Sequence, residues 1–209
     1  MSFVGGLVER VIAESDVHRH TGSERAELFH AVNGGSAELE VLEFLYSLVF
    51  LFKPGLILET GTGCGLATLA IASAVARNGF GALHTVEVDA GCSAGARAFM
   101  GTARPEAQRL TQFHVEKSLD FINRWDGDSF DFVFFDSLLS LRYQEFDAMQ
   151  RRRLLAPKAV CVFHDTSRTR GETMHDYNPD MIAALDEASR GRQWIENDLS
   201  RGVRVLKMG

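Results

Sequence analysis

Cysteine is scarce in this chain, and its spacing excludes the sites that depend on paired thiols. The 209 residues contain only Cys64, Cys92 and Cys161, and no two of them form a CxxC pair. A disulfide framework or a thiolate metal site needs paired or closely spaced cysteines. We therefore expect free thiols and a reducing compartment, which favours a cytoplasmic location.

An excess of basic charge and a long apolar run are also missing. The net charge is −6, whereas a sequence-independent nucleic-acid surface needs clustered Lys and Arg. The apolar stretch 41–58 is interrupted by Glu43, Lys53 and Pro54, which makes it a poor membrane span. The first 15 residues carry acids and lack the basic start of a signal peptide. Neither nucleic acid nor a membrane is expected as a partner.

What is present is typical of one globular domain, with 45% hydrophobic and 24% charged residues. We interpret residues 1–35 as a polar N-terminal helix and loop, and residues 36–209 as the main domain. Ser36 can cap a helix that runs to about Phe52 and is apolar on nearly every face from Phe44 onward. Such a helix is buried in the monomer, or it forms a homodimer interface, as the N-terminal extension also can.

After this helix, short apolar runs alternate with helical stretches. The expected strands are 56–60, 83–88, 111–115, 132–135 and 159–163, and a closing hairpin is expected at 194–197 and 203–207. The expected helices are 66–77, 91–102, a short one from 118, 140–154 and one capped by Asn178 with Pro179 first. This order predicts an α/β fold with a doubly wound, Rossmann-like, mostly parallel seven-stranded sheet and an antiparallel edge strand. Ligands of such sheets bind beyond the carboxyl ends of the strands.

A glycine loop follows the first strand and reads Glu59-Thr60-Gly61-Thr62-Gly63-Cys64-Gly65. Glycines allow a sharp turn and a close approach of the backbone to a ligand. The dinucleotide pattern GxGxxG would place its last glycine where this chain has Leu66. A carboxylate at Glu59 would repel a pyrophosphate and attract the ammonium group of S-adenosylmethionine. The alternative is a tight strand–helix turn without a ligand.

The next two strands also end in polar residues. Glu87 can accept the ribose hydroxyls of an adenosine, whereas Asp89 can cap the following helix. Ser118 follows the third strand, where it either contacts an adenine edge or caps its helix. These positions add a nucleoside site to the glycine loop.

The segments ILETGTGCG, TVEVD and FDFVFFD, in this order and spacing, resemble class I S-adenosylmethionine-dependent methyltransferases. The resemblance covers about residues 36–209. It is strongest to the small-molecule O-methyltransferases related to the catechol and caffeoyl-CoA enzymes, and to bacterial methyltransferases whose fifth strand ends in HDT. It implies a cofactor site made of Glu59, Gly61, Thr62, Gly63, Gly65, Glu87, Val88, Ser118 and Asp136.

Polar residues after the fourth and fifth strands are the candidates for catalysis. Asp136 and the run His164-Asp165-Thr166 converge if these strands are neighbours. Two carboxylates suit an oxygen-bound divalent cation such as Mg²⁺. The resemblance implies that Asp136 and Asp165 hold such a metal, which binds substrate hydroxyls and lowers their pKa. Thr166 stands where the family has an asparagine ligand, and His164 is an alternative ligand.

The candidate catalytic residues also have alternative roles. Leu139 replaces the lysine base of the family, and His164 is a candidate base in its place. Asp136 and Asp165 can instead only hydrogen-bond the cofactor or cap helices. The polar loop 165–178 can act as a lid whose Arg168, Arg170 or His175 reads an acidic substrate group.

We expect an S-adenosylmethionine-dependent methyltransferase that acts on a small molecule, at oxygen, with a possible divalent metal. A rival hypothesis is a non-catalytic module that binds S-adenosylmethionine as a ligand. A second rival is a nicotinamide-dependent oxidoreductase, which Leu66 and Glu59 disfavour.

Overall fold

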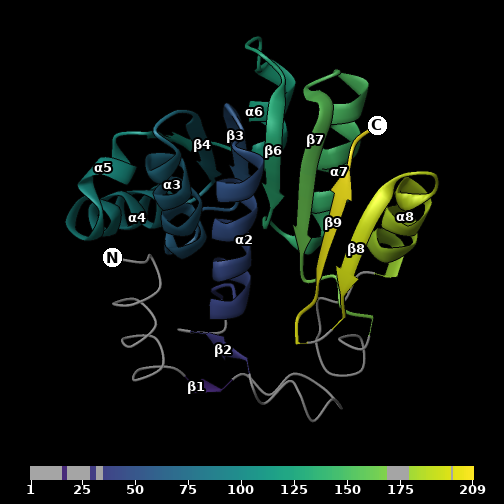
Figure 1. Cartoon of the computed structure of the whole chain (residues 1–209), viewed down its shortest axis with the longest axis horizontal. Helices are drawn as coiled ribbons and strands as arrows, with labels where there is room; N and C mark the ends of the chain where they lie inside the picture. Colours follow the sequence, from purple (N-terminus) through teal and green to yellow (C-terminus); the bar gives the residue numbers. More distant parts are fainter. Residues whose placement is uncertain (1–15, 18–28, 32–34, 169–178, 199) are drawn as a thin grey trace.

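The computed structural model describes residues 16–17, 29–31, 35–168, 179–198 and 200–209. Its main body is a seven-stranded sheet with the strand order β5-β4-β3-β6-β7-β9-β8 (Figure 1). The strands are β3 (Leu56–Thr60), β4 (Ala82–Glu87), β5 (Thr111–Val115), β6 (Phe130–Phe135), β7 (Leu155–His164), β8 (Gln193–Asn197) and β9 (Val203–Lys207). A separate two-residue ladder pairs β1 (Asp16–Val17) with β2 (His30–Ala31).

The sheet topology confirms the predicted doubly wound, mostly parallel fold. The strands β3 to β7 pair in parallel, and β9 runs antiparallel to both β7 and β8. The antiparallel strand is therefore β9, and β8 lies outside it at the edge of the sheet. Strand order reverses between β3 and β6, so a ligand site is expected at the carboxyl ends of these strands.

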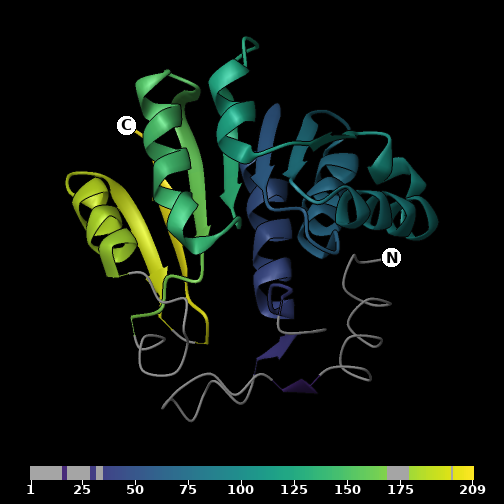
Figure 2. The same ribbon diagram turned by 180° about the vertical axis from the view of Figure 1, so that it is seen from behind.

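Helices cover both faces of the sheet. On one face lie α2 (Leu39–Phe52), α3 (Leu66–Asn78) and α4 (Ala90–Ala103), and on the other lie α6 (Ser118–Arg124), α7 (Leu139–Arg151) and α8 (Pro179–Ser189) (Figures 1 and 2). The short α5 (Pro105–Gln108) packs against α3 and α4. It was not predicted.

Alternating side chains of the central strands explain why both faces are covered. In β6, Phe132 and Phe134 belong to the core beneath α2 and α3, whereas Val133 and Phe135 belong to the core beneath α6 and α7. All four side chains are fully buried. A strand buried on both faces is continuously apolar, as this one is.

Helix α2 begins two residues later than the predicted cap at Ser36 implies. The N-cap residue is Glu38 and not Ser36, and the side chain of Glu38 makes no capping hydrogen bond. Ser36 instead contributes its backbone carbonyl to Arg201 Nη1 at 2.7 Å. The amino end of α2 is thus fixed by long-range contacts and not by a local cap.

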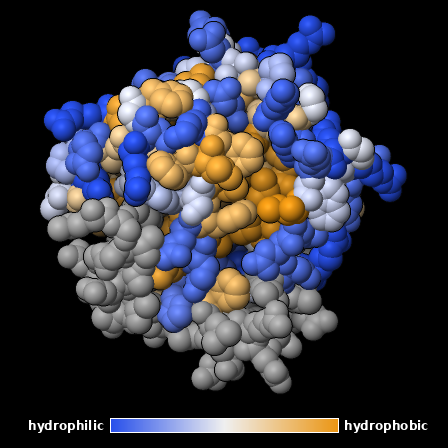
Figure 3. All heavy atoms as spheres, in the orientation of Figure 1, coloured by the Kyte–Doolittle hydropathy of each residue, from blue (hydrophilic) through white to orange (hydrophobic). Residues whose placement is uncertain are grey.

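The outer end of α2 is apolar and exposed at Leu51 and Phe52. Hydrophobic residues gather at the centre of the molecular face on which α2 lies (Figure 3). The homodimer through this helix stays a prediction, as does the division of the chain at residue 35. Among the described residues, no helix combines the length and the apolar character that crossing a bilayer requires.

Candidate active site

A cavity of about 810 Å³ opens at the carboxyl ends of β3, β4, β6 and β7. This size is within the range of small-molecule sites. Of the residues predicted to bind a ligand, those that line the cavity are Gly61, Thr62, Gly63, Glu87, Val88, Ser118, Asp136 and Asp165. The predicted residues Glu59, Gly65, His164 and Thr166 are not part of its wall.

The glycine loop follows β3 and turns into α3 through three positive φ angles. Gly61 has φ 89°, and a Cβ atom there would lie 2.4 Å from the carbonyl oxygen of Asp136. Gly65 also has a positive φ, and a Cβ atom there would lie 2.8 Å from the Cβ of Ala96 in α4. Gly61 therefore allows β3 and β6 to approach each other, whereas Gly65 allows α3 to pack against α4.

Glu87 supports the loop from the end of β4. Its Oε2 accepts a hydrogen bond from the backbone N–H of Gly63 at 2.9 Å, and its Oε1 accepts one from Asp89 N at 3.0 Å. A carboxylate has further lone pairs, so Glu87 can accept ligand hydroxyls as well. The side chain of Asp89 caps α4 by accepting from Cys92 N, which settles the alternative left open for that residue.

Glu59 occupies a different place from the one its predicted role requires. It is fully buried, and its Oε2 accepts from Thr68 and Thr85 at 2.6 Å each. Burial raises the pKa of Glu59 to about 8. The side chain bonds to α3 and β4 and is not part of the cavity wall, and its contact with a ligand ammonium stays a prediction.

Ser118 lines the cavity, and its hydroxyl donates to the buried Glu145 of α7. Ser137 and Thr60 donate to the same carboxyl group at 2.7 and 2.9 Å. Because its proton is committed, Ser118 offers only an acceptor to the cavity, as an adenine amino group requires. Sequence reasoning missed Glu145, since an isolated glutamate in an amphipathic helix usually faces water.

Asp136 and Asp165 converge because β6 and β7 are neighbours, as predicted. Arg142 Nη2 lies 3.0 Å from Asp136 Oδ1, and Arg142 Nη1 lies 2.8 Å from Asp165 Oδ2. Arg201 Nε lies 2.7 Å from Asp165 Oδ1. Both guanidinium groups are buried and line the cavity. The sequence analysis recognised neither arginine as a site residue.

His164 is enclosed by carboxylates. Its Nδ1 lies 3.0 Å from Asp136 Oδ1, and its Nε2 lies 2.8 Å from Glu38 Oε2. Burial lowers the pKa of His164, but Asp165, Asp136 and Glu38 outweigh burial and raise this pKa to about 9. Both nitrogens are engaged and the ring is fully buried, an arrangement that disfavours the predicted role of His164 as a general base.

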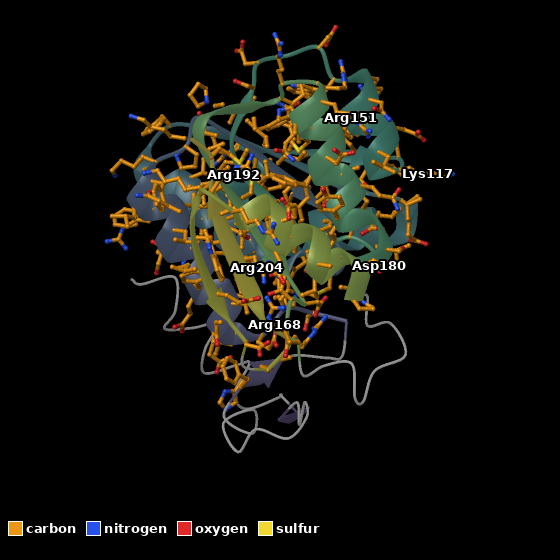
Figure 4. The ribbon with its side chains drawn as sticks, turned by 90° about the vertical axis from the view of Figure 1, so that its right-hand side faces the viewer. Lys117, Arg151, Arg168, Asp180, Arg192 and Arg204 are labelled. Carbon is orange, nitrogen blue, oxygen red and sulfur yellow. The ribbon has the colours of Figure 1, made fainter. Side chains whose placement is uncertain are left out.

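Thr166 and the long loop after β7 contribute less than the sequence suggested. Thr166 is fully buried, its Oγ1 has no hydrogen-bond partner in the described part of the chain, and it is not at the cavity wall. Arg168, labelled in Figure 4, pairs with Asp186 of α8 at 2.6 Å and is not among the residues that line the cavity. Arg170, His175 and the cap at Asn178 lie outside the described residues.

The fold and the site define a Rossmann-like α/β protein with a glycine-loop ligand cavity at the switch in strand order. The profile of a methyltransferase-domain family matches residues 58–166, slightly more than half of the chain. The chain therefore belongs to this methyltransferase family. No curated protein matches the sequence.

Solved structures with the same fold come from several organisms. The O-methyltransferase TomG of Streptomyces achromogenes, in complex with SAM, is 22% identical, with a TM-score of 0.68 over 83% of this chain and 82% of that one. A Bacillus cereus O-methyltransferase in complex with SAH is 20% identical, with a TM-score of 0.69 over 85% and 84%. The SAH-bound Podospora anserina methyltransferase PaMTH1 is 16% identical, with a TM-score of 0.68 over 84% and 80%.

Proposed function

We propose that this chain is an S-adenosylmethionine-dependent methyltransferase that methylates a small molecule at oxygen. The observation that carries the proposal is a single cavity that joins the glycine loop, Glu87 and Ser118 to the carboxylate of Asp136. A nucleoside site and a carboxylate for the acceptor then lie within one volume. The SAM and SAH complexes of the similar O-methyltransferases support this reading.

The positions of Gly61, Glu87 and Ser118 in the cavity fit S-adenosylmethionine. Gly61 removes the side chain that would fill the space between β3 and Asp136. Glu87 offers a hydroxyl acceptor held by two backbone N–H groups, and Ser118 offers an acceptor held by Glu145. When bound, S-adenosylmethionine supplies a methyl group to an acceptor oxygen, whose hydroxyl proton must leave.

Asp136 is the group best placed to receive that proton. Its Oδ1 is held by Arg142 and His164, whereas its Oδ2 has no hydrogen-bond partner among the described residues. Its side chain is 15% exposed, compared with 3% for Asp165. We therefore assign Asp136 as the residue that orients the acceptor hydroxyl and accepts its proton.

The three free cysteines support the cytoplasmic location that the sequence predicts.

Calorimetric titration with S-adenosylhomocysteine and, in parallel, with NADH tests the cofactor. We expect S-adenosylhomocysteine to bind and NADH not to bind. Mass spectrometry of a panel of phenols and hydroxy acids, incubated with S-adenosylmethionine, then tests the transfer. Binding of NADH alone would overturn the proposal. Binding of S-adenosylhomocysteine without transfer to any acceptor would favour the non-catalytic module.

Asp136→Asn tests the assigned base. We expect the turnover rate to fall roughly 100-fold or more, because general base catalysis contributes about 10²–10⁴-fold. The variant keeps the oxygen that can accept from Arg142, so S-adenosylhomocysteine should bind within a few-fold of the unmodified chain. Equal turnover in the two proteins would remove Asp136 from the chemistry.

A further inference from the structure

The cluster of Asp136, His164 and Asp165 has the arrangement of a metal site but not its chemistry. The ligand atoms of these residues lie within 4.8 Å of one another, as three ligands of one cation would. The family resemblance also implied a divalent metal here. Whether these side chains can hold a cation depends on the partners that they already have.

The two carboxylates are paired with arginines. Asp165 accepts from Arg201 through both oxygens, at 2.7 and 3.3 Å, and its Oδ2 also lies 2.8 Å from Arg142 Nη1. Asp136 Oδ1 lies 3.0 Å from Arg142 Nη2. The lone pairs that a metal would need thus already accept hydrogen bonds from the guanidinium groups. An arginine also stays protonated in proteins, so its positive charge remains beside the site.

His164 cannot act as the third ligand in this arrangement. Both of its ring nitrogens face carboxylate oxygens, of Asp136 on one side and Glu38 on the other. A ring that donates from both nitrogens is an imidazolium and has no lone pair for a metal. Its side chain is fully enclosed, so it cannot turn toward the cavity without breaking both contacts.

The charges of the cluster are already balanced. Three carboxylates, from Glu38, Asp136 and Asp165, are paired with three positively charged side chains, which are Arg142, Arg201 and His164. A divalent cation would add two positive charges next to two guanidinium groups in a buried environment, where these charges would repel one another. The residues present therefore do not fit the metal that the resemblance implied.

The two arginines still have N–H groups without a hydrogen-bond partner among the described residues. Arg142 uses four of its five N–H groups, on the Ser137 and His164 carbonyls and on Asp136 and Asp165. Arg201 uses three, on Asp165 and on the Ser36 carbonyl. Both side chains line the cavity next to Asp136, and apolar residues such as Leu138 and Leu139 line it nearby.

We propose that the acceptor site works without a metal, and that Arg142 and Arg201 supply the fixed positive charge that a divalent cation supplies in metal-dependent enzymes. The site takes a small molecule with an acidic oxygen, a phenolic hydroxyl or a carboxylate, which accepts hydrogen bonds from these guanidinium groups. Where this oxygen is a phenolic hydroxyl, Asp136 lies beside it and receives its proton, whereas a carboxylate oxygen is already deprotonated and needs no base. This inference rests on the proposed function, which the S-adenosylhomocysteine titration tests separately.

Titration with Mn²⁺, followed by electron paramagnetic resonance, tests the metal directly and needs no activity. We expect no stoichiometric binding to the unmodified chain at micromolar Mn²⁺. A bound Mn²⁺ ion that Asp165→Ala abolishes would overturn the proposal. If S-adenosylhomocysteine binds while Mn²⁺ does not, the proposed function and the metal-free site both stand.

A double variant, Arg142→Met with Arg201→Met, should create the missing metal site. It leaves Asp136 and Asp165 without their guanidinium partners, so we expect Mn²⁺ to bind to the double variant and to raise the thermal midpoint of this variant by several degrees. The control is Arg151→Met, because Arg151 is exposed on α7 and lies far from Arg168 and from the carboxyl ends of the strands (Figure 4). Should the double variant not fold, the titration of the unmodified chain still decides.

The acceptor class is tested with 3,4-dihydroxybenzoate, which carries both a hydroxyl pair and a carboxylate. With S-adenosylhomocysteine present, we expect equal affinity in EDTA and in Mg²⁺, and a loss of at least 10-fold in Arg201→Met. Binding that requires Mg²⁺ would overturn the metal-free site. Absence of binding under both conditions would overturn the acceptor class.

Discussion

Gly61 directly follows β3 and lies against Asp136, the residue that follows β6. A Cβ atom at this position would meet the carbonyl oxygen of Asp136 at 2.4 Å, and φ is 89°. Gly63, two residues along the same loop, also has a positive φ but has nothing within 4 Å of its Cβ position. An alanine at Gly63 therefore adds only backbone strain, whereas an alanine at Gly61 adds backbone strain and a steric overlap.

We expect Gly61→Ala to lower the free energy of unfolding by roughly 1–3 kcal/mol more than Gly63→Ala does, because it adds overpacking to the strain of a positive φ. Urea denaturation of both variants measures this difference. Gly61→Ala should also weaken S-adenosylhomocysteine binding, because Asp136 must move. Equal unfolding free energies for the two variants would mean that β3 and β6 can separate without loss.

His164 makes stability depend on pH in a defined direction. Its pKa is about 9 in the folded chain and about 6.5 when unfolded, so the folded state binds the proton more tightly. The stabilisation is complete below pH 6.5 and is lost as the pH rises through 9; it is on the order of 3 kcal/mol. Glu38, Asp136 and Asp165 are the carboxylates that face the ring.

Thermal denaturation between pH 6 and 10 measures this effect. The midpoint of the unmodified chain should fall with rising pH, whereas His164→Gln should have a lower midpoint at pH 6.5 and a flatter profile. Parallel profiles for the two proteins would show that the imidazole is neutral in the folded chain.

At the scale of elements, Glu38 connects the start of α2 to β7 and to the turn before β9. Its carboxylate contacts His164 Nε2 at 2.8 Å, Ser200 Oγ at 2.7 Å and Arg201 N at 3.2 Å. Although burial raises its pKa, the pairing with His164 and Arg201 lowers it well below the usual range. One side chain thus holds three segments that are distant in sequence.

We expect Glu38→Ala to reduce the free energy of unfolding by about 3–5 kcal/mol, because it leaves buried positive charge without its partner. The matched control is Glu40→Ala in the same turn, whose carboxylate is 38% exposed and pairs with His30. That change should cost less than about 1 kcal/mol. Urea denaturation of both variants checks the contrast, and similar losses would contradict the role of Glu38.

The elements were largely predictable from sequence, whereas their ends were less so. The bounds of β3, β5 and β9 are those expected, because Pro54-Gly55 and the polar residues that flank each run define the ends locally. The start of α2 was misplaced, because Glu38 and Ser36 are held by residues more than a hundred positions away.

At the scale of the whole molecule, a ligand of the cavity should stabilise the entire fold. The cavity is lined by the end of β4 and by the segments that follow β3, β5, β6 and β7, so a bound ligand connects the ends of five strands. S-adenosylhomocysteine at 100 times its dissociation constant should add about 2.7 kcal/mol and raise the thermal midpoint by roughly 5–11 °C. NADH at the same concentration is the control and should leave the midpoint unchanged.

The sequence by itself determined the order of strands and helices, the glycine loop and the residues at the carboxyl ends of the strands. These follow from local rules: alternation of apolar residues, turn chemistry and the topology of parallel sheets. Only the tertiary structure decided what Asp136, His164 and Asp165 are paired with. The partners Glu38, Arg142 and Arg201 come from α2, α7 and the turn before β9. Charge pairing in a buried site depends on distances in space, which no spacing along the chain encodes.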